Sequence, residues 1–220
     1  PSKFKPMLHI ALWVLIAFLG YQTYISIYTP VLFNKEKNKR YATVIENLID
    51  IRDSELAHRQ VTGKFTDNFD ELVKFIETAK YTITQRRDVS VPDEEGNKRF
   101  GLTSMTKEIV VIDTLGFVSV KDSLFKTSTR YKTMMNVPVG QAGEKFKLLA
   151  GFLELNDAKI PVFEASVKKD IILFDQDRDM VIQENQVVSV DGVNGDALKV
   201  GSMNEIKTIG NWPKTYGSNE

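Results

Sequence analysis

The pattern of hydrophobic and polar positions divides the chain into one long apolar run and a remainder in which apolar and polar residues alternate. The run from Met7 to Tyr28 contains no Asp, Glu, Lys or Arg. As a helix it would be about 33 Å long, close to the thickness of about 30 Å of the hydrocarbon core of a bilayer. The sequence therefore predicts a transmembrane anchor over residues 7–29, after a short tail of residues 1–6.

The residues that flank the apolar run bear on its processing and orientation. The run lacks the shorter apolar core and the small-x-small site of a cleaved signal, so we expect an uncleaved signal-anchor. Two lysines precede it and four basic residues within residues 35–40 follow it. Basic residues alone place the C-terminal side in the cytoplasm, but a long domain can be translocated despite them. We expect an anchor in the bacterial inner membrane with a periplasmic domain, and a cytoplasmic domain is the alternative.

The apolar run also contains residues able to contact a neighbouring helix. Small side chains allow close approach, and hydroxyl and amide groups can form hydrogen bonds between helices. These residues are Ala11, Ala17, Gly20, Gln22, Thr23 and Ser26. The polar ones either meet lipid headgroups or bind a partner. Our hypothesis is that the run is a docking helix which contacts another membrane protein.

Residues 30–80 have the pattern of helices. Pro30 is expected to end or kink the apolar helix, because proline has no N–H to donate, and Asn34 is a suitable N-cap for the next helix. In that helix apolar residues recur at steps of three and four. They are Tyr41, Val44, Ile45, Leu48, Ile51 and Leu56. We expect this 41–56 stripe, like the anchor, to bind other membrane or envelope proteins.

Two local patterns predict where these helices end and begin. Gly63 is expected to end the helix that carries the stripe, because glycine favours the C-terminal cap position. Asn68 followed by Glu71 has the spacing of a capping box and predicts a shorter second helix.

From residue 81 to residue 220 the chain has the pattern of a β-rich domain. Short runs rich in β-branched and aromatic residues are separated by Gly, Asn and Asp, which favour turns. The runs are "YTITQ", "EIVVIDT", "GFVSV", "KFKLLAGFLEL", "IPVFEASV" and "DIILF". No helical segments alternate with them, which favours antiparallel pairing. "DRDMVIQENQ" is compatible with a helix or a strand. The predicted fold class is α+β, with a mostly antiparallel β-rich domain.

A resemblance follows from the segment "IENLIDIRDSELAHRQVTGKFTDNFDELVKFI" behind the apolar helix. The first 80 residues or so are similar to type IV pilin-like proteins, including type II secretion pseudopilins. The chain also resembles an uncharacterised membrane-anchored family of Bacteroidetes, through "IENLIDIRD", "VTGKF", "KIPVFEAS" and "ALKVGS". These resemblances imply a subunit that is held in the membrane by its first helix and works with envelope proteins.

The charge balance and the absence of cysteine exclude several classes of function. The chain has 29 basic and 29 acidic residues, which gives no basic surface for nucleic acid. Because it has no cysteine, it has no disulfide framework, thiolate zinc site or cysteine nucleophile. We expect no nucleic acid among its partners.

Two patterns contain residue types that occur in metal or catalytic sites. Glu55 and His58 share one helix face, but no second copy of this pair exists, so we expect an exposed pair on a solvated surface. Asp175, Asp177 and Asp179 alternate as in a calcium loop, but the required glycine and glutamate are absent. We expect a charged turn, and hence no catalytic residues, no metal and no cofactor.

Together these patterns predict a single-pass structural or scaffolding subunit of a bacterial envelope assembly of the secretion or pilus type, and not an enzyme. The alternative is a membrane-tethered module that binds a lipid, a peptide or a cation. A deep apolar cavity in the β-rich domain would favour the alternative.

Overall fold

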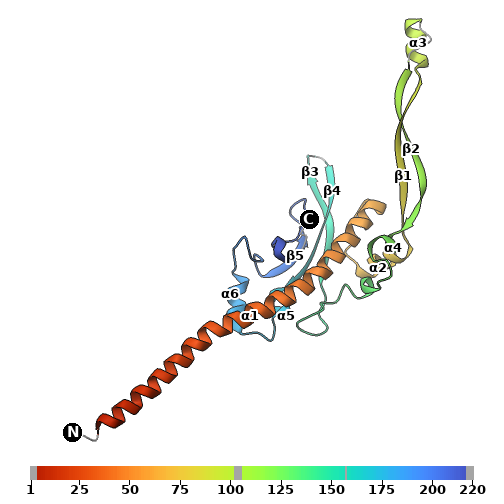
Figure 1. Ribbon diagram of the computed structural model, residues 1–220. Coiled ribbons are helices and arrows are strands. Elements are labelled where there is room, and N and C mark those ends of the chain that lie inside the picture. The colour runs from red at the N-terminus through yellow and green to blue at the C-terminus, as the bar shows by residue number, and fades with distance from the viewer. Residues whose placement is uncertain (1–3, 102–105, 157, 217–220) are drawn as a thin grey trace.

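A helix of 59 residues, α1 (Phe4–Thr62), dominates the fold. In the computed structural model, which describes residues 4–101, 106–156 and 158–216, its first half projects alone. Its second half crosses the folded body, to which the other helices and the sheets contribute (Figure 1). The fold is α+β, as the sequence predicted.

The remaining elements are short helices and two antiparallel sheets. The helices are α2 (Phe69–Thr78), α3 (Glu94–Phe100), α4 (Val120–Leu124), α5 (Lys169–Ile172) and α6 (Arg178–Asn185), with 3-10 turns η1 (Arg130–Lys132) and η2 (Lys214–Tyr216). One sheet pairs β1 (Lys80–Pro92) with β2 (Thr106–Ser119), and the other has the order β3 (Lys147–Leu155), β4 (Ala158–Lys168), β5 (Ala197–Gly201). Both sheets are antiparallel, as predicted.

The continuity of α1 corrects one prediction. Pro30 lies inside the helix and does not end it, and Asn34 is an ordinary helical residue rather than an N-cap. A proline removes one backbone donor, whereas the helical turns on both sides already hold the backbone in place. The helix therefore continues through Pro30 despite the lost hydrogen bond and the crowding of its ring against the preceding turn.

The apolar stripe of α1 forms the centre of the body's core. Tyr41, Val44, Ile45, Leu48 and Ile51 have no exposed surface, and they belong to a single hydrophobic cluster with residues of α2, β4 and β5. The stripe residues from Tyr41 to Ile51 are thus buried within this chain, and Leu56 is half-buried. Most of the surface that the sequence pattern assigned to a partner is therefore covered by the protein's own core.

The predicted ends of the helices are confirmed. Gly63 has a φ of +82°, and its N–H donates to the carbonyl of Arg59 at 2.8 Å. The side chain of Asn68 caps α2 by accepting from two backbone N–H groups of its first turn. Glu71 does not complete a capping box, because its carboxylate accepts instead from the hydroxyl of Thr66 at 2.9 Å.

Two of the β predictions were wrong in their type of element. "DIILF" forms α5 and the turn after it rather than a strand, and "DEEGNK" lies largely in α3 rather than in a loop. A short apolar run does not by itself distinguish a strand from a buried helical turn. "DRDMVIQENQ", whose pattern fits a helix or a strand, contains α6.

Strands β1 and β2 form a hairpin that projects from the body and carries α3 at its far end (Figure 1). This projection, residues 80–119, is termed the arm. Its base is tied to the body where the N–H of Val120 donates to the carbonyl of Ala79 at 3.1 Å. A bulge between Ile83 and Thr84 shifts the register near the base.

We expect the body to fold without the arm. Replacing residues 83–116 by a two-residue Asn-Gly turn joins Thr82 to Phe117, which are already opposite each other. The free energy of unfolding should change by less than about 1 kcal/mol, because the strands beyond the base contact mainly each other. Urea denaturation in detergent, followed by the fluorescence of the buried Trp212, measures this.

The control is Ile76→Ala, which removes a fully buried side chain of α2 and should cost about 2–5 kcal/mol. A loss of similar size on removing the arm would show that the arm is part of the body's cooperative unit.

Candidate functional site

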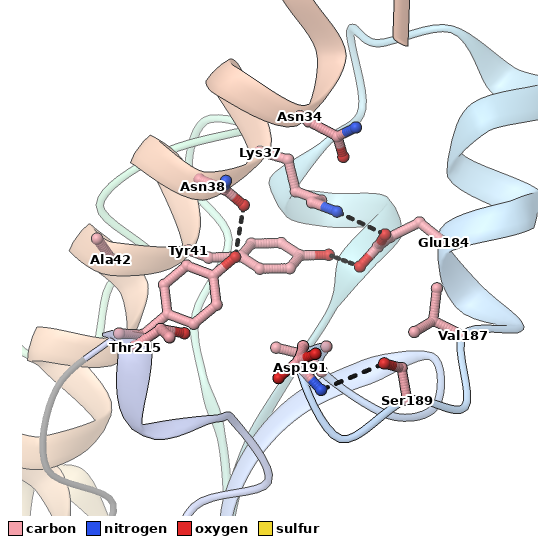
Figure 2. A pocket seen from close by; sticks show the side chains of 13 residues that line it. Asn34, Lys37, Asn38, Tyr41, Ala42, Glu184, Val187, Ser189, Asp191 and Thr215 are labelled. Atoms are coloured by element: carbon pink, nitrogen blue, oxygen red, sulfur yellow. Dashed lines mark hydrogen bonds and ion pairs between the residues drawn. The ribbon is translucent and has the colours of Figure 1, made fainter. Parts of the chain in front are cut away.

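A cavity of about 680 Å³ lies beside residues 34–42 of α1, where the buried half of this helix begins. Lys37 and Tyr41 of α1, Glu184 of α6, Asp191 of the following loop and Tyr216 of η2 contribute to its lining. Figure 2 shows that Lys37 and Tyr41 converge on one space with Glu184 and Asp191, which come from a distant part of the sequence. At the cavity, Lys37 and Tyr41 of α1 contact Glu184, and Asn38 of α1 accepts from the hydroxyl of Tyr216.

Local structure explains how α6 delivers Glu184 to this place. The side chain of Asp177 caps α6 by accepting from two N–H groups of its first turn. Val181 and Glu184, three residues apart, lie on one helix face, and both are buried. Burial of the apolar Val181 in the core thus turns the carboxylate of Glu184 toward α1.

The carboxylate of Glu184 accepts from three side chains. Lys37 donates to Oε2 at 2.9 Å, and the hydroxyl of Tyr41 donates to Oε1 at 3.3 Å. Lys169 also donates to Oε1, at 3.3 Å. These four residues are termed the Glu184 cluster. Its members come from α1, α5 and α6, so it joins three elements of the body.

Lys169 has no exposed surface at all. Besides the carboxylate, its ammonium group donates to the backbone carbonyls of Glu184 at 2.6 Å and of Val193 at 2.8 Å. An ammonium has three protons, and here each has an acceptor. Lys169 therefore fixes the end of α6 and the loop after it.

Burial and charge act on the titrating groups of the cluster. Burial lowers the pKa of Lys169, although the charge of Glu184 opposes this. Burial also raises the pKa of Tyr41, and the neighbouring Glu184 carboxylate raises it further. The pKa of Tyr216 is raised for the same two reasons. Both phenols remain protonated at neutral pH and act as hydrogen-bond donors.

This arrangement suits binding better than proton transfer. Every polar atom of the Glu184 cluster described above already has a partner within the protein, so these side chains hold one another in place. The cavity beside them presents amide, hydroxyl and carboxylate groups and is within the size range of small-molecule sites. Its lining mixes polar and apolar surface in similar parts, so it is not the deep apolar cavity that would favour a lipid ligand.

Glu55 and His58 are buried, in contrast to the exposed pair expected from sequence. Glu55 has no exposed surface and His58 is 2% exposed. Oε2 of Glu55 accepts from the N–H of Thr66 at 3.1 Å, and Oε1 has no partner among the described residues. Nδ1 of His58 lies 2.7 Å from the carbonyl of Lys64, to which it donates. Burial raises the pKa of Glu55 to about 8.

The burial of this pair follows from the apolar stripe of α1. Glu55 comes four residues after Ile51, and His58 comes seven residues after it, so both continue the stripe. The spacing was thus present in the sequence, but the polar character of the residues concealed it.

The three alternating aspartates have separate roles. Asp175 forms a bidentate ion pair with Arg40, with Nη2 and Oδ2 2.9 Å apart, and this contact lowers the pKa of Asp175 to about 2. Asp177 caps α6, and Asp179 is exposed. Within residues 4–101, 106–156 and 158–216, no three acidic or histidine side chains gather in a way that could hold a metal ion.

The six residues proposed for docking in the membrane are all exposed on α1. Four of them, Ala11, Gln22, Thr23 and Ser26, fall within about 120° of the helix circumference at about 100° per residue. The other two, Ala17 and Gly20, lie on the opposite side. The hydroxyl of Thr23 donates to the carbonyl of Leu19 at 2.8 Å, so it already has an acceptor within the helix.

We expect Glu55→Gln to remove a pH dependence of stability. Because the pKa of Glu55 rises from about 4.5 to about 8 on folding, stability present below about pH 4.5 is lost as the pH rises toward 8. The variant should be more stable than the wild type at pH 8 by about 1–4 kcal/mol, and similar to it near pH 4.5. Denaturation with urea across this range measures the effect.

The control for this experiment is Glu46→Gln, an exposed position of the same helix, which should keep the wild-type slope. Equal slopes for wild type and Glu55→Gln would contradict a raised pKa at Glu55.

A second expected outcome concerns Lys169→Met. This change leaves two buried carbonyls without a donor and removes one positive charge beside Glu184, which should cost about 3–5 kcal/mol. Lys168 is exposed, and Lys168→Met should change the free energy of unfolding by about 0.5 kcal/mol or less. Similar losses for the two variants would show that Lys169 does not hold the cavity wall.

In the comparison with known proteins, no protein-family model, no curated protein and no solved structure matches the chain. Its function must therefore be inferred from its own residues and geometry.

Proposed function

We propose that this protein is a single-pass structural or scaffolding subunit of a bacterial envelope assembly, of the secretion or pilus type. Its first helix spans the inner membrane and its body lies in the periplasm. The observation that carries this proposal is α1 itself. One uninterrupted helix has a first half that no other described part of the protein covers and a second half that forms the centre of the body's core.

The exposed half of α1 supports a membrane location. It is long and apolar enough to cross a bilayer, and its most apolar window has no buried residue. Trp13, Leu8 and Ile27 are 71%, 68% and 67% exposed. Apolar surface costs about 25 cal/mol per Å² in water, so a helix that exposes such side chains on every side is suited to lipid.

The connection between the two halves of α1 supports a scaffolding role. Phe33, which is 8% exposed, is the first side chain of α1 buried in the body, and it lies only about 8 Å along the helix beyond Tyr28. No flexible linker separates them, because the helix is continuous. The body is therefore held close to the bilayer at a fixed orientation to the helix, with the arm at the far end (Figure 1).

The anchor is proposed to bind another membrane protein as well as lipid. The face with Ala11, Gln22 and Ser26 offers a small residue near one end and two polar groups near the other. Gln22 and Ser26 are one helical turn apart, which allows both to meet the same neighbouring helix. Partners of this kind are other envelope proteins rather than nucleic acid.

A second candidate function rests on the cavity beside the Glu184 cluster. Its volume of about 680 Å³ and the charged and hydroxyl groups in its mixed lining suit a small polar ligand, or a cation beside Asp191, more than a lipid. In that case the protein would be a membrane-tethered binding module, with the ligand held between α1 and η2.

The membrane anchor can be tested by extraction with alkaline carbonate. We expect the full chain, expressed in a Gram-negative host, to stay in the membrane pellet. The variant Leu15→Arg with Leu19→Arg should be released, because each central arginine costs about 2.5–3.5 kcal/mol on insertion. Recovery of the wild-type chain in the soluble fraction would overturn the proposal.

The same membranes test orientation and docking. A periplasmic body should be digested by protease added to spheroplasts, and its full protection would instead place it in the cytoplasm. Replacing residues 7–28 by a polyleucine span should preserve pelleting but reduce crosslinking to membrane partners. Unchanged crosslinking would show that residues 7–28 only hold the protein in the membrane and do not bind a partner.

A further inference from the structure

The arm is a two-stranded sheet with an open edge on each side. Its two strands pair with each other from Lys80↔Ser119 to Pro92↔Thr106, and each has an outer edge that no described strand covers. A two-stranded hairpin is marginally stable in water, and an open edge offers unpaired N–H and C=O groups to another strand. Such an arm gains stability from a third strand.

On one face of the arm, the side chains of β2 are mainly apolar, whereas those of β1 are polar. On this face β2 presents Val110, Ile112 and Phe117, which are 47%, 66% and 66% exposed. The paired positions of β1 on the same face are polar, for instance Asp88 opposite Val110 and Arg86 opposite Ile112. A strand added beside β2 would therefore cover apolar side chains that β1 leaves exposed.

The charges of the two strands differ in sign. Strand β1 has three basic side chains and one acidic one, whereas β2 has two acidic side chains and one basic one. Within the arm, Arg87 of β1 already pairs with Asp113 of β2 at 2.9 Å, and both side chains stay well exposed. The outer edge of β1 is thus complementary in charge to the outer edge of β2. Two edges of the same kind would repel.

We propose that the arms of neighbouring copies pair edge to edge, β1 of one copy with β2 of the next, to form one antiparallel sheet. This inference rests on the proposed membrane anchor, because α1 then directs all arms the same way. Arms that point the same way can pair antiparallel only as β1 with β2, since two β1 strands or two β2 strands would run parallel. Strand direction and charge thus select the same contact.

The proposed contact has two consequences for assembly. It joins different surfaces of the two copies, so it repeats and generates a row or a ring rather than a closed pair. A contact about 43 Å long and about 10 Å deep buries on the order of 800 Å² in total, below the roughly 1,200 Å² of stable soluble complexes. Confinement to one membrane raises the effective concentration, so pairing is expected in the bilayer and not in dilute detergent.

The absence of cysteine from the chain allows a direct test. Thr84 and Thr114 are opposite each other within the arm and both are exposed, so each can be changed with little effect on folding. Two differently tagged copies, one with Thr84→Cys and one with Thr114→Cys, are co-expressed and treated in membranes with a short bismaleimide. We expect mixed dimers to exceed both kinds of homodimer. Thr78→Cys, on α2 outside the arm, measures random collision.

Charge complementarity gives the test a second readout. Adding Arg86→Glu to the Thr84→Cys copy should lower the yield of mixed dimers about two- to fivefold. Mixed dimers at the level of the Thr78→Cys control, an equal yield of homodimers, or crosslinks only to a different protein would each overturn the proposal. If the crosslinking result is negative but carbonate extraction still leaves the chain in the pellet, the proposal of a membrane anchor is retained and only the proposal of paired arms is rejected.

Discussion

Packing of one face of α1 against β4, β5 and α2 fixes where the rest of the molecule lies. The helix is long enough to have two environments, one in which it buries Val44, Ile45 and Leu48 and one in which it exposes apolar side chains on all sides. Since both belong to one rigid element, the position of the body follows from the position of the helix. The orientations of the arm and of the cavity relative to the membrane are therefore also set by α1.

The Glu184 cluster reinforces this arrangement at the point where the body begins. Lys37 and Tyr41 reach the cluster from α1, and Lys169 reaches it from α5. A buried carboxylate and a buried ammonium are each costly alone, and together they are tolerated because all three ammonium protons of Lys169 and both carboxylate oxygens of Glu184 have partners. Polar contacts thereby add specificity to a junction that apolar packing alone would leave free to slide.

Much of this fold follows from local patterns in the sequence. The apolar run, the stripe of α1, the glycine at position 63 and the cap at Asn68 depend on neighbouring residues only, and each is found where the pattern predicts it. Antiparallel pairing followed from the lack of helical crossovers. The length of the arm did not, because "EIVVIDT" and "GFVSV" form one strand whose continuity depends on its partner.

The buried polar residues were harder to predict because their type indicates the surface while their spacing indicates the core. Lys169 continues the inward positions of β4, two residues after Val167. Glu55 likewise continues the stripe after Ile51. A polar side chain at an inward position is buried when hydrogen-bond partners are present in the core. These partners come from segments distant in sequence, such as the carbonyl of Val193, which accepts from Lys169. Periodicity was the better guide at both positions.

The central claim is that one unbroken helix passes from the bilayer into the core of the body. The most direct measurement is the distance between spin labels at Val14→Cys and Glu46→Cys, two exposed positions on either side of Pro30, in chain reconstituted into bilayers. A continuous helix predicts a single narrow distribution centred at about 48 Å, from about 1.5 Å per residue. A clearly shorter mean or a broad distribution would show a kink or a hinge between membrane and body, and would contradict the account.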